Sequence, residues 1–198
     1  MRRLLCLSAV LAGITLNISA HPHVFISARA EVEFTDDVPT AVHTRWEFDD
    51  FFSRMILLDF AGGSSSLNSR QIADIRSGAF DNLSHYNYFL HILVDGQEVP
   101  ITEVRDFHAE VDGRTLVYSF RVPLPQPDGP DAAVLRGVRE IVVGVYDDSY
   151  YSYFDYPQQP VSFRGDVPAG TRSETRERPD RRYYFNLIVP EMFHIRWD

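Results

Sequence analysis

The sequence predicts a mainly β fold, an immunoglobulin-like β-sandwich with a two-helix insertion after the second strand. Three observations lead to this prediction. Short segments with a period of two recur along the chain, and Asp-Gly pairs of the kind that form tight turns end some of them. A helical spacing of apolar residues replaces the period of two only over about residues 49–85. Seven or more short strands separated by turns are typical of a sandwich.

The first two strands are expected to form a hairpin. From His23 onward, apolar and polar side chains alternate as far as Phe34, as in a half-buried strand. Residues 35–39 form a turn, and a second alternating run follows, with an inward face made of Val42, Thr44, Trp46 and Phe48. His23 and His43 then lie on polar faces of the two strands, where a ligand or solvent reaches them.

The helical insertion begins where the period changes after the second strand. Asp49 or Asp50 would cap a first helix, and the stretch 62–66, rich in Gly and Ser, would end it. Ser69 is the expected cap of a second helix. The apolar face of that helix would consist of Ile72, Ile75, Ala79, Phe80 and Leu83.

The rest of the chain is expected to complete a single domain over residues 21–198. Its predicted strands cover residues 86–94, 104–112, 116–122, 141–146, 161–163 and 183–189. The charged segment 170–182 is expected to be mobile.

Residues 1–20 are predicted to be a cleaved signal peptide. Arg2 and Arg3 precede an apolar stretch, and Ala20 supplies the small residue at the cleavage point. The protein would then be exported, with a mature chain that starts at His21. The only cysteine, Cys6, lies in this leader, so we expect no lipid anchor, no disulfide and no thiolate metal ligand in the mature chain.

The composition argues against nucleic acid as a partner. The sequence has 19 basic residues, all Arg, and 28 acidic ones, so its formal net charge is −9. Loss of a leader that carries two Arg and no acidic residue makes the mature chain more acidic still. An acidic chain binds phosphates poorly and attracts cations instead.

The strongest candidate site is the junction His21-Pro22-His23. Cleavage after Ala20 would place a free α-amine beside two imidazoles, a nitrogen donor set suited to a divalent transition metal such as Ni, Co, Cu or Zn. Asp147 or His43 is expected to complete the shell. The alternative is that the two histidines are a solvated strand start.

The acidic, Tyr-rich loop that starts at Asp147-Asp148 is the second candidate. Its carboxylates would complete a metal site, or they would organise a turn through local backbone bonds, as Asp often does. Enzyme signatures such as G-x-S-x-G, a phosphate-binding Gly-rich loop and H-E-x-x-H are absent from the sequence. We therefore expect no enzymatic activity.

The order of motifs resembles a known family. The motifs are the leader, His21–Phe25, Trp46–Ser53, Tyr88-Phe89 before Asp95-Gly96, Arg105–Phe107 and Val145–Tyr151. They are similar to a proteobacterial periplasmic family of unknown function described as the periplasmic component of an uncharacterised ABC-type transport system. Such proteins often accompany nickel/cobalt export permeases. The resemblance implies a periplasmic location, a membrane permease as partner and a role in metal transport.

The resemblance has one departure that bears on calcium. Many relatives carry an acidic, calcium-loop-like stretch between the two helices, but this chain has no carboxylate between Asp59 and Asp74. Calcium binding is therefore not expected here. The alternative function is an interaction module without a metal that docks on a membrane permease or an envelope partner. A copper redox enzyme built on the terminal histidine is the third interpretation.

Overall fold

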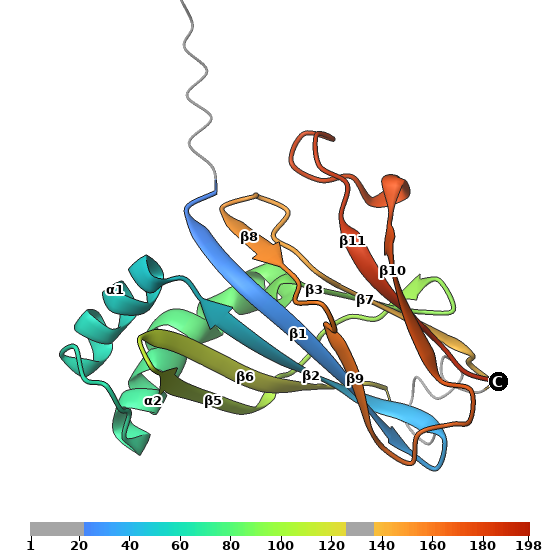
Figure 1. The fold of residues 1–198 in the computed structure, drawn as a ribbon, viewed down its shortest axis with the longest axis horizontal. Coiled ribbons are helices and arrows are strands. Elements are labelled where there is room, and N and C mark those ends of the chain that lie inside the picture. The colour runs from blue at the N-terminus through green and yellow to red at the C-terminus, as the bar shows by residue number, and fades with distance from the viewer. Residues whose placement is uncertain (1–21, 126–136) are drawn as a thin grey trace, which may run out of the picture.

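The computed structural model describes residues 22–125 and 137–198 and contains two β-sheets arranged as a sandwich (Figure 1). Its strands are β1 (Val24–Thr35), β2 (Val38–Phe48), β3 (Leu90–Val94), β4 (Gln97–Glu98), β5 (Arg105–Asp112), β6 (Thr115–Pro123), β7 (Glu140–Val145), β8 (Ser152–Asp155), β9 (Val161–Gly165), β10 (Arg172–Glu177) and β11 (Glu191–Arg196). Its helices are α1 (Asp50–Ala61), α2 (Ser69–Ile75), a π-helical turn (Arg76–Phe80) and two 3₁₀ segments (Asp81–Phe89 and Pro179–Arg181).

Each of the two sheets combines strands from the N-terminal and the C-terminal half of the chain. The first sheet has the order β5-β6-β2-β1-β8, and β9 also pairs with β1. The second sheet has the order β10-β11-β7-β3-β4. Strands β8 and β9 both run parallel to β1, β8 beside Val24–Ser27 and β9 beside Ala30–Phe34. They cover the edge of β1 that β2 leaves open.

The structure confirms the predicted β-sandwich, its first hairpin and the position of its helical insertion. Strands β1 and β2 pair antiparallel, with Ile26 opposite Phe48 at one end. The expected inward side chains of both strands are buried. The alternation arises because one face of each strand packs on the second sheet while the other faces solvent.

Helix α1 begins where the sequence indicated, and α2 begins with a different cap. The Asp49 carboxylate accepts a hydrogen bond from the Phe52 N–H and caps α1. The expected cap of α2, Ser69, is wrong, since Asn68 caps that helix and forms a reciprocal capping box with Gln71. Helices α1 and α2 lie together at one end of the molecule, beside β6 and β5 (Figure 1).

Three predicted segments differ from the structure. The strand expected over 86–94 starts only at Leu90, because Asn87, Tyr88 and Phe89 have positive φ angles. The segment 170–182 contains β10, whose six side chains are all exposed. Because β10 buries no side chain, its sequence carries no alternation of apolar and polar residues that would predict a strand. The strand expected over 183–189 is a turn closed by a Tyr183–Ile188 bridge, and the last strand is β11.

An aromatic cluster forms the core where the two sheets meet the helical insertion. The ring of Trp46 lies 4.9 Å from Phe120, 5.5 Å from Phe154 and 6.0 Å from Phe89, measured between centroids. Most of these contacts are edge-to-face, the arrangement that aromatic rings favour. In the part of the chain that the structure describes, no helix is long and apolar enough to cross a membrane.

Candidate functional site

The start of β1 fixes the backbone of His23 and leaves its side chain exposed. The His23 N–H donates to the Tyr151 carbonyl at 2.8 Å, and the two rings lie 5.0 Å apart. Two residues further on, Phe25 pairs with Tyr153 of β8. The imidazole of His23 therefore stands at the surface, on a main chain that is held in place. His21 and the predicted leader lie outside the described residues.

The Asp147 carboxylate organises the 147–152 loop, which pairs with the start of β1. Its Oδ1 accepts hydrogen bonds from the Ser149 N–H at 2.9 Å and the Ser149 hydroxyl at 2.6 Å. Its Oδ2 accepts from the Ser152 N–H at 2.9 Å. The residue is only 2% exposed. Because Ser152 pairs with Val24, Asp147 lies at the same end of the sandwich as His23, and both of its oxygens bond within their own loop.

His43 lies on the outer face of the first sheet, far from His23. Its Nε2 is 2.5 Å from Glu33 Oε2, and Arg121 Nε donates to the same oxygen at 3.2 Å. The hydrogen bond from His43 is the main cause that lowers the pKa of Glu33, and Arg121 adds to it. His43 sits opposite Glu31, eight residues along β1 from His23, which corresponds to about 26 Å. The structure therefore does not bring the two histidines to one site.

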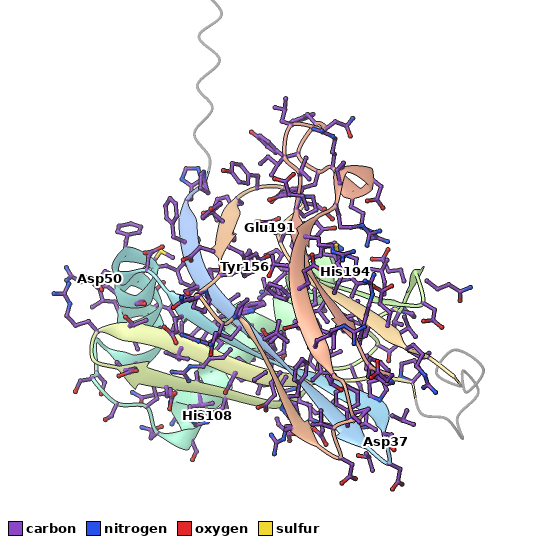
Figure 2. The ribbon with its side chains drawn as sticks, turned by 45° about the vertical axis from the view of Figure 1, so that its right-hand side comes forward. Asp37, Asp50, His108, Tyr156, Glu191 and His194 are labelled. Atoms are coloured by element: carbon purple, nitrogen blue, oxygen red, sulfur yellow. The ribbon has the colours of Figure 1, made fainter. Side chains whose placement is uncertain are left out.

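The other acidic and histidine side chains that the structure describes are scattered over the fold. Within residues 22–125 and 137–198, no three His, Cys, Asp or Glu side chains are grouped so that they could hold a metal ion. Figure 2 shows His108 on β5 and His194 on β11, two separate places in the fold. His194 Nδ1 lies 2.9 Å from Glu140 Oε1, so this histidine is part of an ion-pair network with Arg196.

An apolar cavity that the sequence analysis did not anticipate lies beneath α1. It has a volume of about 430 Å³ and opens at the same end of the molecule as His23. Side chains from β1, β2, α1, the Asp81–Phe89 segment, β6 and the 147–152 loop line it. Its walls include Val24, Ile26, Phe48, Phe52, Ile56 and Phe89. The volume falls in the range of small-molecule sites, about 300–1,000 Å³.

Helix α1 also presents an apolar stripe to solvent. Phe51, Met55 and Leu58 are 76%, 41% and 59% exposed. Their spacing of four and then three residues places them on one face of the helix. The opposite face buries Ser53, Ile56, Leu57 and Ala61. Exposed apolar side chains that lie next to one another are a known feature of interaction surfaces.

Comparison with known proteins places the chain in a family. A family model described as "Protein of unknown function (DUF1007)" matches residues 6–184. The chain belongs to this family. It is also similar to a protein of Spirochaeta aurantia named "Uncharacterized 15.5 kDa protein in trpE 3'region", which is 23% identical over 146 residues. That alignment covers 72% of this chain and 98% of the relative. The family is described as one of unknown function, so membership assigns no activity to this DUF1007 protein.

Proposed function

We propose that this DUF1007 protein is a periplasmic accessory or solute-binding protein of a transport system, and that it binds a divalent transition metal through its mature N-terminus. The observation that carries the proposal is the placement of His23. Its backbone is anchored to Tyr151 while its imidazole is exposed. A metal bound there would sit at a fixed point of the fold and remain open to a partner.

The proposed ligands are the imidazoles of His21 and His23 and the α-amine that leader removal after Ala20 would create. Pro22 between them has no backbone N–H. A square-planar chelate that uses two deprotonated backbone amides is therefore blocked. The ion would keep open coordination positions, as a carrier that passes its metal to a permease requires. The acidic composition of the chain favours the approach of a cation.

The test is a titration of the correctly processed protein. Protein that starts at His21 should bind Ni²⁺, Cu²⁺ or Zn²⁺ with one ion per chain in calorimetry. A Gly-Ser extension before His21 and the substitutions His21→Ala and His23→Ala should each weaken that binding strongly. His108→Ala, at an exposed histidine of β5, is the matched control and should change nothing. Equal affinities in all five proteins would refute the N-terminal site.

A second candidate function is docking on a membrane permease or an envelope partner without a metal. The exposed stripe of Phe51, Met55 and Leu58 favours it. A photo-crosslinking residue at position 58 in cells should then give one discrete adduct with a membrane protein, and Phe51→Ser with Met55→Ser should abolish it. The same crosslinker at Asp112, an exposed position at the end of β5, is the control. Metal stoichiometry separates this candidate from the first.

A further inference from the structure

Two residues that line the apolar cavity beneath α1 each carry a buried polar atom without a hydrogen-bond partner among the described residues. Trp46 of β2 and Tyr118 of β6 both line it, and they sit directly opposite each other in the strand pairing. The residues are 0% and 2% exposed. In the described part of the chain, neither the Trp46 Nε1–H nor the Tyr118 hydroxyl has a hydrogen-bond partner.

Such a pair of orphaned donors is unusual in a folded protein. Buried polar side chains nearly always find a protein or water partner, and each exception calls for an explanation. Burial raises the pKa of the Tyr118 hydroxyl, so it stays a neutral donor. A molecule in the cavity that offers an acceptor oxygen would satisfy one or both groups.

The wall of the cavity also contains strained backbone. Asn87, Tyr88 and Phe89 have φ angles of 50°, 49° and 53°. This left-handed region is costly for residues other than glycine, and three consecutive residues adopt it here. Phe89 itself lines the cavity. Backbone strain of this kind concentrates at ligand-binding and switch segments.

The charges around the cavity define the chemistry of its occupant. Among the described residues, no Arg or His lines the cavity, so this part of the chain offers no counter-charge to an anion there. The one carboxylate, Asp147, already accepts three hydrogen bonds from its own loop, so it is a poor partner for a cation. The Trp46 N–H and the Tyr118 O–H require an acceptor. Most of the other lining side chains are apolar, and Tyr86, Ser149, Tyr151 and Ser152 complete the wall.

We propose that this cavity is a binding site for a neutral small molecule with an apolar body and one hydrogen-bond-accepting oxygen, which receives hydrogen bonds from Trp46 and Tyr118. His23 is not among the lining residues, and this proposal does not depend on the proposed metal site. Residues of α1 and of the 147–152 loop both line the cavity, so an occupant would contact both the helix and the loop that anchors His23.

The probe is prodan, a neutral fluorescent naphthalene with one ketone oxygen, titrated into the metal-free mature protein. We expect saturable binding with a blue shift of its emission. Tyr118→Phe should weaken prodan binding about fivefold, the value of one net hydrogen bond, and the double variant with Trp46→Phe should weaken it further. Because Tyr118→Phe removes an unpaired hydroxyl, the thermal midpoint of the empty protein should stay unchanged or rise.

Two controls separate this site from a general loss of structure. Tyr156→Phe removes a hydroxyl that donates to the Val145 carbonyl at 2.7 Å, and neither residue lines the cavity. It should lower the thermal midpoint and leave prodan affinity unchanged. Dimethylaminonaphthalene, which lacks the ketone, should bind wild type and Tyr118→Phe equally. Absence of prodan binding, or prodan affinities that agree between wild type and both Phe variants, would overturn the proposal.

Discussion

Asp49 and Phe25 bond to each other twice, once in each direction. The Phe25 N–H donates to Asp49 Oδ2 at 2.8 Å, and the Asp49 N–H donates to the Phe25 carbonyl at 2.9 Å. The other carboxylate oxygen of Asp49 accepts from the Phe52 N–H at 2.8 Å. One carboxylate therefore joins the first turn of α1 to the strand that presents His23. The helix, the cavity beneath it and the start of β1 are held together at this point.

Asp49→Ala should destabilise the fold by about 3 kcal/mol. Loss of a helix N-cap costs about 1 kcal/mol, and loss of a hydrogen bond to a charged acceptor adds about 2 kcal/mol. Urea unfolding measures the change. The neighbouring Asp50→Ala is the matched control, since Asp50 forms only an exposed ion pair with Arg114, worth at most about 1 kcal/mol. A loss at Asp49 no larger than that at Asp50 would contradict this role.

Asp147→Asn should lower stability without changing metal affinity. An asparagine keeps one acceptor oxygen, which serves the Ser149 donors, but its amide group then faces the Ser152 N–H. One unsatisfied buried contact costs about 2 kcal/mol. Unfolding in the presence of a chelator and a metal titration measure the two effects separately. Asp148→Asn, at an exposed position in the same loop, should alter neither. A drop in metal affinity at Asp147→Asn would instead make Asp147 a ligand.

The sequence predicted those parts of the fold whose side-chain pattern follows from burial. Strands β1 and β2 alternate because each buries one face, and Asp49 precedes α1 as a cap should. Burial does not determine β10, which is held by backbone bonds and exposes every side chain. Asn87, Tyr88 and Phe89 have positive φ angles, so the strand predicted over 86–94 begins only at Leu90. Their residue types do not predict such angles.

The site was less predictable than the fold, because it depends on register and on space left empty. Alternation placed His23 and His43 on polar faces, but only the pairing of His43 with Glu31 shows that they lie at different ends of β1. The cavity arises where α1 and the Asp81–Phe89 segment stand away from Trp46 and Tyr118. A pattern read along one strand at a time carries no signal for such a gap.

Calcium should leave the thermal midpoint unchanged. The connection between α1 and α2 offers hydroxyls and glycines where a hard cation takes several carboxylate oxygens. Asn68 offers the best side-chain oxygen for a metal ion in this connection. That oxygen already accepts hydrogen bonds from the Arg70 and Gln71 N–H groups. Thermal unfolding with added calcium and then with chelator tests this. A midpoint that rises with calcium and returns with chelator would reveal a site that the connection does not suggest.

The pH dependence of stability near neutrality should depend on His91. This histidine of β3 is 8% exposed and stacks on Tyr146, with ring centroids 3.8 Å apart and planes at 5°. Burial is the main effect on its pKa and lowers it below 6.5, against the opposing pull of the Asp148 and Glu98 carboxylates, while Arg181 lowers it further. The unfolded chain therefore takes up this proton first as the pH falls.

Because the unfolded chain takes up the His91 proton first, stability falls as the pH falls. Stability from neutral His91 is complete above about pH 6.5 and declines as the pH falls below it. His91→Phe keeps a ring to stack on Tyr146 and removes the titration, so its urea midpoint should change less than that of wild type between about pH 7.5 and about pH 5.5. His108→Gln, at an exposed site on β5, should keep the wild-type slope. Equal slopes in wild type and His91→Phe would show that burial of His91 does not govern stability in this range.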